Sequence, residues 1–482
     1  MSTHIVWFRR DLRLADNPAL YAALEEADAV LPVYIHAPEQ EADWPPGAAS
    51  RWWLHHSLNA LHAALEQRGS GLIVRAGDPL TVLQELIAAS GATAVHWGRC
   101  YEAAAIARDR SVKAALREAG ISVRSHASNL MAEPWTLATG NGDPYRVYSP
   151  FARRFHAFVQ PSEPLPAPAR VPLPEAATRM ALGNSAIDAL ELLPRIRWDE
   201  GLADAWSPGE AGAQARLQHF VHNGAGRYDT GREAPGTDGT SRLSPHLHFG
   251  ELSPRQAWAA SEAVKEQSTQ SGVEHFQREL IWREFAYHLI YHYPHTVDTP
   301  LNPRFADFPW RSPSDYAEDL RAFQRGQTGI PIVDAGMRQL WHTGWMHNRV
   351  RMIVGSFLTK NLLIPWQEGA RWFWDTLVDA DLASNTLGWQ WAAGSGADAA
   401  PYFRIFNPIL QSQKFDADGA YVREWVPEIA ALPNKPLHAP WEASASVLRE
   451  AGIRLGEHYP EPRVDLKASR QRALDAYEKV KG

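Results

Sequence analysis

Residues 4–35 read HIVWFRRDLRLADNPALYAALEEADAVLPVYI, and this stretch decides the fold class. Its two ends, HIVWF (4–8) and VLPVYI (30–35), are short apolar runs of the kind that form buried strands. Between them, residues 18–27 have a helical pattern. A strand, a helix and a second strand at this spacing indicate a βαβ unit with parallel strands.

The same alternation continues to about residue 130. Three more apolar runs, GLIVRA (71–76), AVHWG (94–98) and ISVRS (121–125), are separated by helical patterns at 49–67, 79–89 and 101–119. We therefore expect an α/β domain with a doubly wound, Rossmann-like parallel sheet of five strands over residues 1–130.

The chain changes character in two steps after this domain. A proline-rich segment, QPSEPLPAPARVPLPEAA (160–177), holds six prolines between 161 and 174, so it is extended and not helical. From about residue 205 helical patterns dominate and strand signals nearly vanish. The sequence thus predicts a linker over 131–204 and a larger all-α domain over 205–482.

Composition narrows the class of protein. The only cysteine, Cys100, allows no disulfide within the chain, which suits a reducing interior. The start MSTHIVWFRRDLRL is no signal peptide, and no apolar run approaches a membrane span, so we expect a cytoplasmic protein. A net charge of −7 argues against binding nucleic acid over the whole surface, but it allows a local basic patch. We expect no metal site. Twenty tryptophans, most of them in the second half, suggest aromatic surfaces or cofactor chemistry.

Residues 236–258, GTDGTSRLSPHLHFGELSPRQAW, combine hydroxyl side chains with two Ser-Pro helix starts. Thr240, Ser241 and Ser244 at a helix start would suit a phosphate or pyrophosphate. Two successive N-caps explain the same letters, and the local pattern alone favours that explanation.

Two helical stretches carry mixed polar and aromatic faces. In ELIWREFAYHLIYHYP (279–294), Glu279, Trp282 and Arg283 share one face, either as a solvated edge or as the wall of a polar pocket. In TGWMHNRVRMIVGSFL (343–358) a second stripe is separate from the aliphatic one, which suggests that it faces a ligand. That stripe consists of Trp345, Asn348, Arg349 and Met352.

Residues 375–408 place two carboxylates, Asp379 and Asp381, shortly before Trp389 and Trp391. With Arg351 available, a buried ion pair is expected, and a charge-sensitive cofactor would justify its desolvation. A metal is the rival explanation, but the run has no histidine.

Five motifs then point to a family. VWFRRDLRLADNPAL, GTSRLSPHLHFGELSPRQ, ELIWREF, TGWMHNRVRM and GWQWAAGSGADAAPYFRIFNP, in this order and at this spacing, resemble the photolyase/cryptochrome family, and most of all its class I cyclobutane pyrimidine dimer photolyases of bacteria. The resemblance implies a U-shaped FAD, active as FADH⁻, that donates an electron under blue light to a dimer flipped out of DNA. The expected partner is UV-damaged DNA, double- or single-stranded, bound by a monomer.

The resemblance also assigns site residues. The FAD contacts would be Tyr228, Thr240, Ser241, Leu243, Ser244, Phe276, Trp345, Arg351, Asp379, Asp381 and Asn385. The dimer contacts would be Glu279, Asn348, Trp282, Trp391 and Met352. The DNA phosphate contacts would be Arg232, Arg283, Arg349, Arg404 and Lys414, and the electron-transfer chain would be Trp389, Trp366 and Trp310.

Single positions refine the resemblance. Asn348 follows His347 where (6-4) photolyases have a second histidine, and Asn385 is an amide where plant cryptochromes have Asp and animal cryptochromes have Cys.

Ala104 and Ala105 replace the polar and acidic residues of the folate antenna site, which argues against methenyltetrahydrofolate. A deazaflavin, another chromophore or no antenna all stay open.

Two other functions are weighed against light-driven repair. A cryptochrome-type photoreceptor without repair activity is disfavoured by the complete set of dimer contacts and by the lack of a long tail after the last helix. A dark FAD-dependent oxidoreductase would need an acid or base catalyst of its own, and the sequence offers only Glu279.

Overall fold

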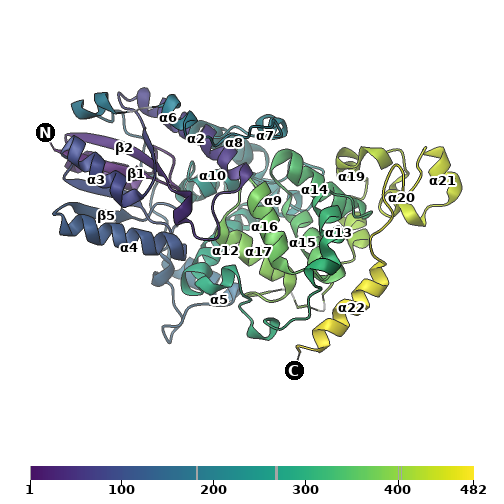
Figure 1. The fold of residues 1–482 in the computed structure, drawn as a ribbon. Coiled ribbons are helices and arrows are strands. Elements are labelled where there is room, and N and C mark those ends of the chain that lie inside the picture. The colour runs from purple at the N-terminus through teal and green to yellow at the C-terminus, as the bar shows by residue number, and fades with distance from the viewer. Residues whose placement is uncertain (1, 181–182, 266–269, 400, 403, 482) are drawn as a thin grey trace.

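A parallel sheet at one end of the molecule is joined to a larger helical body in the computed structural model, which describes residues 2–180, 183–265, 270–399, 401–402 and 404–481. Figure 1 shows the sheet with the N-terminus at one side and the C-terminal helix α22 (Leu466–Glu478) at the other. The α/β domain followed by an all-helical region confirms the fold class predicted from the sequence.

The sheet has five parallel strands in the order β3-β2-β1-β4-β5. They are β1 (Thr3–Phe8), β2 (Ala29–His36), β3 (Ile73–Ala76), β4 (Ala94–Gly98) and β5 (Ser122–His126). The helices between them are α1 (Pro18–Glu26), α2 (Ala48–Glu66), α3 (Pro79–Ser90) and α4 (Ala103–Glu118). Both faces of the sheet are covered, as parallel sheets require.

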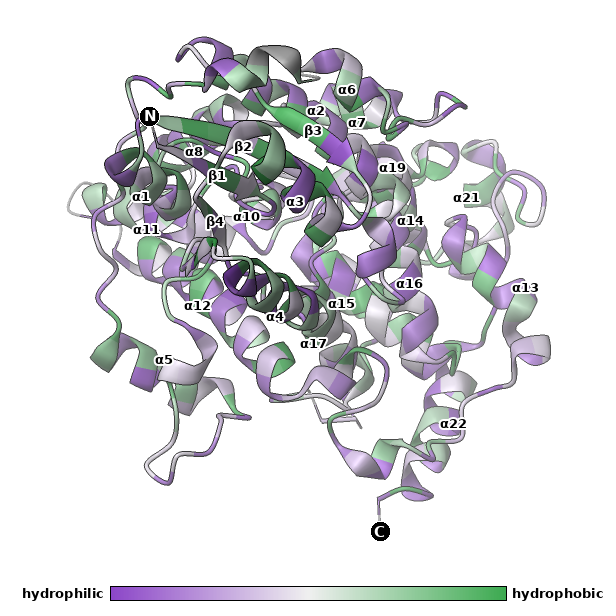
Figure 2. Ribbon diagram, turned by 60° about the vertical axis from the view of Figure 1, so that its left-hand side comes forward, coloured by the Kyte–Doolittle hydropathy of each residue, from purple (hydrophilic) through white to green (hydrophobic). Residues whose placement is uncertain are grey.

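The central strand β1 shows how the two faces are packed. Val6 and Phe8 point into a core shared with α1 and α2, whereas Ile5 and Trp7 pack with residues of α3 and α4. All six residues of β1 are buried, which explains its continuous apolar pattern. Figure 2 shows the hydrophobic strands beside helices of alternating character.

The proline-rich segment is extended, as predicted, until the short helix η3 (Glu175–Arg179) begins. It lies along the α/β domain, where the amide of Val171 donates to the carbonyl of Arg68 and that of Val30 to the carbonyl of Pro172. The region 131–204 also contains helices that the sequence did not predict: α5 (Tyr148–Phe158), α6 (Asn184–Asp188) and α7 (Glu200–Ala205).

The helical body is built around α12 (Gln270–His292). Its other helices are α8 (Glu210–Asn223), α9 (Tyr228–Gly231), α10 (Ser244–Phe249), α11 (Pro254–Ala263), α13 (Pro313–Gln324), α14 (Pro331–Thr343), α15 (Asn348–Ser356), α16 (Trp366–Thr376), α17 (Leu382–Ala393), α18 (Pro408–Phe415), α19 (Ala420–Trp425), α20 (Asn434–Leu437) and α21 (Ala445–Glu450). In the described part of the chain, no helix is long and apolar enough to span a membrane.

One predicted helix begins later than expected. The stripe over 343–358 assumed a helix from Trp345, but α15 begins at Asn348. Gly344 ends α14 in the left-handed region with φ 66°, and the ring of His347 accepts a hydrogen bond from the amide of Arg349 at the start of α15. Trp345 therefore lies in the connection and not on the same helical face as Asn348.

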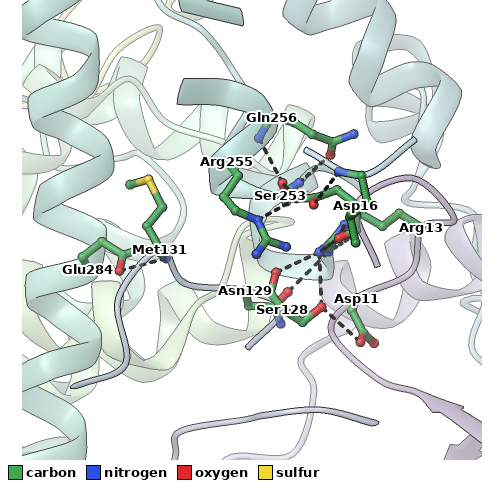
Figure 3. A network of polar contacts seen from close by, with 12 residues as sticks. Asp11, Arg13, Asp16, Ser128, Asn129, Met131, Ser253, Arg255, Gln256 and Glu284 are labelled. Carbon is green, nitrogen blue, oxygen red and sulfur yellow. Dashed lines mark hydrogen bonds and ion pairs between the residues drawn. The ribbon is translucent and has the colours of Figure 1, made fainter. Parts of the chain in front are cut away.

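A buried polar network joins the two domains, and Figure 3 shows it in close-up. Arg13, which is fully buried, donates to the carbonyls of Ser128 (2.8 Å) and Gly250 (2.9 Å). Asp16, equally buried, accepts hydrogen bonds from Ser253 and from Arg255 (3.0 Å). Both residues belong to the loop between β1 and α1, so this loop holds the start of α11 against the sheet.

Glu284 on α12 extends the network toward the linker. Its carboxylate accepts hydrogen bonds from the amides of Met131 (3.0 Å) and Ala132 (3.1 Å). Burial nevertheless raises the pKa of Glu284 to about 7. The folded protein therefore holds a proton between about pH 4.5 and 7 that the unfolded chain releases.

We predict that the free energy of unfolding falls as the pH rises from about 4.5 to 7, because the folded state binds more protons than the unfolded state in that window. Glu284→Gln should flatten that part of the pH dependence. Urea unfolding at a series of pH values measures it. Glu274→Gln, an exposed change on the same helix, is the control and should keep the wild-type slope. An unchanged slope in Glu284→Gln would contradict the assignment.

Candidate functional site

A buried ion pair lies where α10, α15 and the loop before α17 meet. Arg351 donates to both carboxylate oxygens of Asp379, at 2.9 and 3.1 Å, and the hydroxyl of Ser244 donates to the same carboxylate at 2.6 Å. The side chain of Asp379 is only 3% exposed, whereas that of Arg351 is 26% exposed. The ion pair predicted from the sequence is thus present, and one edge of it is accessible.

Asp381 lies two residues further on, immediately before α17. It caps the helix by accepting the amide of Ser384 at 2.9 Å, while its other oxygen accepts the hydroxyl of Tyr287 and faces His248 Nδ1 at 3.4 Å. Burial acts to raise the pKa of Asp381, but the hydrogen bonds and charges of His248, Arg283 and Tyr287 hold it well below its ordinary value. The site therefore contains two buried carboxylates with partners.

Asn385 is one turn beyond Asp381 on α17. The side-chain nitrogen of Asn385 donates a hydrogen bond to the carbonyl of Ala370 on α16 at 3.0 Å, and the side-chain oxygen takes no part in this bond. The contact fixes the direction of the amide between two packed helices.

The hydroxyl-rich loop is held by a residue that the sequence did not single out. Arg216 on α8 donates to the carbonyls of Thr240 (2.9 Å) and Ser241 (2.8 Å) and pairs with Asp238 at 2.8 Å. The local explanation of two successive N-caps holds for only one serine. Ser253 caps α11 in a capping box with Gln256, whereas Ser244 is the first residue of α10 and bonds Asp379 instead.

Tyr228 and Phe276 form an aromatic wall behind this loop. They are 7% and 2% exposed and pack edge-to-face with ring centroids 5.8 Å apart. Leu243, 1% exposed, belongs to the same cluster. These three residues therefore belong to one buried apolar cluster, and their contact with FAD stays a prediction.

Two predicted DNA-contact arginines are paired with carboxylates. Arg232 lies 2.5 Å from Glu279 on α12, and Arg349 pairs with Glu233 while stacking over Phe415. The side chain of Glu279 is 30% exposed. An incoming ligand of Glu279 would therefore meet a carboxylate whose charge is already balanced.

The other predicted dimer contacts lie on α12 and α15, both of which pack against α17, and on α17 itself. Trp282 stacks on Tyr148 with ring centroids 3.6 Å apart and stays half-buried. Met352 and Trp391 are also half-buried, and Asn348 is exposed at the start of α15. The predicted dimer contacts are thus all reachable from solvent.

The remaining predicted cations differ in their surroundings. Arg404 and Lys414 are exposed. Arg283 instead donates to the carbonyl of Asn129 at 2.6 Å and lies over the ring of Tyr287. Its guanidinium therefore serves the protein interior, and its phosphate role stays a prediction.

The three predicted electron-transfer tryptophans span the core of the helical body. Trp389 is 3% exposed and packs on Phe373 with ring centroids 4.9 Å apart. Trp366, 2% exposed, begins α16, and Trp310 packs on Phe308 near the surface. The amide of Arg311 donates to the carbonyl of Leu363, which brings the segment of Trp310 beside the start of α16.

The site also contains a buried histidine with an unused nitrogen. His347 is 1% exposed, and its Nε2 has no hydrogen-bond partner among the described residues. Burial and nearby arginines lower its pKa to about 3, so the ring is neutral. Next to it, Trp345 is 7% exposed and packs under the guanidinium of Arg242 at 4.9 Å. An orphaned nitrogen, an accessible ion pair and hydroxyl groups suit a large polar ligand.

Comparison with known proteins identifies the family of the chain. Residues 4–169 match the family model for DNA photolyase, and residues 276–479 match that for the FAD binding domain of DNA photolyase. A deoxyribodipyrimidine photo-lyase of Agrobacterium fabrum is 47% identical over 99% of this chain and 98% of its own length. The chain belongs to the photolyase/cryptochrome family.

Both branches of the photolyase/cryptochrome family are represented among the relatives. The crystal structure of a bacterial class III photolyase from Agrobacterium tumefaciens superposes with a TM-score of 0.95 at 46% identity, covering 100% of this chain and 98% of that one. Cryptochrome-2 of Arabidopsis thaliana is 38% identical over 97% of this chain and 77% of its own length. Family membership alone therefore does not separate repair from signalling.

We predict that Gly369→Ala destabilises the protein by about 1–3 kcal/mol, because a Cβ at Gly369 would lie 2.1 Å from the ring of Trp389. Gly388→Ala is the matched control, since Gly388 is also helical and a Cβ there meets nothing within 4 Å. It should raise the free energy of unfolding by up to about 1 kcal/mol. Urea unfolding measures both, and equal effects would refute the packing role of Gly369.

Proposed function

We propose that this chain is a deoxyribodipyrimidine photo-lyase, which splits cyclobutane pyrimidine dimers in UV-damaged DNA under blue light. The observation that carries the proposal is the accessible Arg351–Asp379 ion pair, together with half-buried and exposed predicted dimer contacts on α17 and on the two helices packed against it, α12 and α15. The near full-length similarity to a photo-lyase supports it.

The cofactor would be FAD. Ser244, Arg351 and Asp379 form a charged, hydrogen-bonding edge, and Tyr228 with Phe276 forms the apolar side, so the residues present fit a flavin with a polar tail. When bound in its reduced form, this cofactor would provide the electron needed to open the dimer. The protein contributes fixed charges next to the ring, and Asn385 contributes a rigidly held amide.

The lesion would be recognised by side chains that do not read sequence. Trp282 and Trp391 would stack on the flipped bases, and Glu279 and Asn348 would hydrogen-bond their edges. Arg404 and Lys414, which are exposed, would contact phosphates with an affinity that falls as salt rises. Because Arg232 already pairs with Glu279, the carboxylate would face a bound dimer without leaving an unpaired charge in the pocket.

Trp389, Trp366 and Trp310 would carry electrons from the surface to the flavin. Their gradation from buried to partly buried supports this assignment, because a chain of this kind must end at solvent.

The branch within the family is a finer question. The sequence predicted class I, but the solved structure with a TM-score of 0.95 and 46% identity is that of a class III photolyase. We favour the class III branch on that similarity.

The identity of the antenna chromophore stays open. Ala105, one of the two residues that depart from the folate pattern, lines a cavity between the domains together with Arg10 and Trp44.

The proposed function is tested by incubating the reduced protein with DNA that contains pyrimidine dimers, in blue light and in darkness. Loss of dimers only in the light is the expected result. A photoreceptor without repair activity, or an oxidoreductase that works in the dark, would leave the dimers intact in both. That outcome would sink the proposal.

Glu279→Ala tests the substrate pocket separately from the cofactor. The loss of a charged hydrogen bond, about 1.5–3 kcal/mol, should lower repair at limiting DNA roughly tenfold or more while FAD stays bound. Repair assays and the flavin absorption of the purified variant measure the two effects. Glu274→Gln, exposed on the same helix, should behave as wild type. Loss of flavin in Glu279→Ala would place this residue against the cofactor instead.

A further inference from the structure

Three histidines form a diagonal row across the sheet, far from the site described above. His4 is in β1, His96 in β4 and His126 in β5. Val6 pairs with His96, and Gly98 pairs with His126, so each histidine is offset by two residues from the previous one. Offsets of two keep all three imidazoles on one face of the sheet. It is the face of Val6, which α1 covers.

The imidazole nitrogens of the row are in contact. His96 Nε2 lies 3.2 Å from His4 Nδ1, and His96 Nδ1 lies 3.2 Å from His126 Nε2. Two imidazole nitrogens bound to one tetrahedral zinc ion, at 2.0–2.1 Å each, are about 3.3 Å apart. The pair formed by His4 and His96 therefore has the separation that a shared metal requires.

A carboxylate completes the group. Glu26 is the last residue of α1, and its ligand atom, with those of His4 and His96, falls in a set whose members all lie within 4.8 Å of one another. One oxygen of Glu26 pairs with Arg124, which leaves the second oxygen for another partner. The Glu26 side chain is 35% exposed, whereas His96 is fully buried, so an ion would have a route from solvent.

His126 has a different part in the arrangement. If His96 Nδ1 carries the ring proton and donates a hydrogen bond to His126 Nε2, the lone pair of His96 Nε2 faces His4 and Glu26. Metal-binding histidines commonly use their second nitrogen in this way, which fixes the tautomer and the ring orientation.

The charged groups that face the row are Glu26, Arg124 and, near His126, Arg99 and Asp11.

We infer that His4, His96 and Glu26 form a binding site for a divalent transition-metal ion, best suited to zinc, with His126 as the positioning residue for His96. Two nitrogen ligands and one carboxylate leave the fourth tetrahedral position to water. The ion would tie the end of α1 to β1 and β4. The sequence predicted no metal site because these residues come from separate elements and show no recognisable spacing.

The experiment uses the full-length protein, stripped with a chelator and then mixed with zinc chloride. After gel filtration, zinc per protein is measured by atomic emission, and thermal unfolding is followed with and without zinc. We expect about one retained zinc and a higher unfolding midpoint with the metal, because a ligand of the folded state stabilises it.

Two variants and one control decide whether the zinc is at this site. Glu26→Gln and His4→Gln should weaken zinc binding at least tenfold, while Glu25→Gln, the exposed neighbour, should not change it. If His4→Gln does not fold, Glu26→Gln decides alone, since its side chain is at the surface. No retained zinc in the wild type, or equal retention in Glu26→Gln, would overturn the inference and leave a hydrogen-bonded imidazole chain.

Discussion

The buried guanidinium of Arg13 is the contact on which the rest of the structure depends. It has no exposed surface, and its carbonyl partners lie in its own loop, on the loop after β5 and on the residue after α10. Removing a group of this kind from water costs several kcal/mol, so it is stable only where every donor has a partner. Because those partners come from both domains, the relative position of the sheet and of α10 is fixed by the need to satisfy one side chain.

That constraint reaches the candidate site through α10. Gly250 ends this helix with φ 67°, and a Cβ there would lie 1.9 Å from the carbonyl of Arg10. The close approach holds α10 against the loop after β1. The same short helix begins with Ser244, which bonds Asp379, and contains His248, which faces Asp381. Both buried carboxylates are therefore oriented by a helix whose position the sheet determines.

Most of the fold could be predicted from the sequence, because its signals are local. The five strands and the helices of the α/β domain lie within about two residues of their predicted bounds, since apolar period and length suffice there. The late start of α15 could not be predicted, because it depends on the conformation of Gly344 and the cap at His347. Arg216 was missed for a different reason. Its role is to bind carbonyls more than twenty residues away, and no spacing rule describes such a contact.

The candidate site was predicted mainly from resemblance, and the structure adds how its charges are balanced. Glu279 and Glu233 each hold an arginine, so the pocket presents paired charges before any substrate arrives.

The helix α17 shows why the two tryptophans of GWQW are placed two residues apart. Successive residues of an α-helix turn by about 100°, so Trp389 and Trp391 point in nearly opposite directions. Trp389 fills the space that Gly369 leaves on α16, and Trp391 stays half-buried at the opposite side. A single helix thereby separates a buried ring suited to electron transfer from an accessible ring suited to stacking. Any shift of α17 along α16 would disturb both, because the glycine admits the indole at only one position.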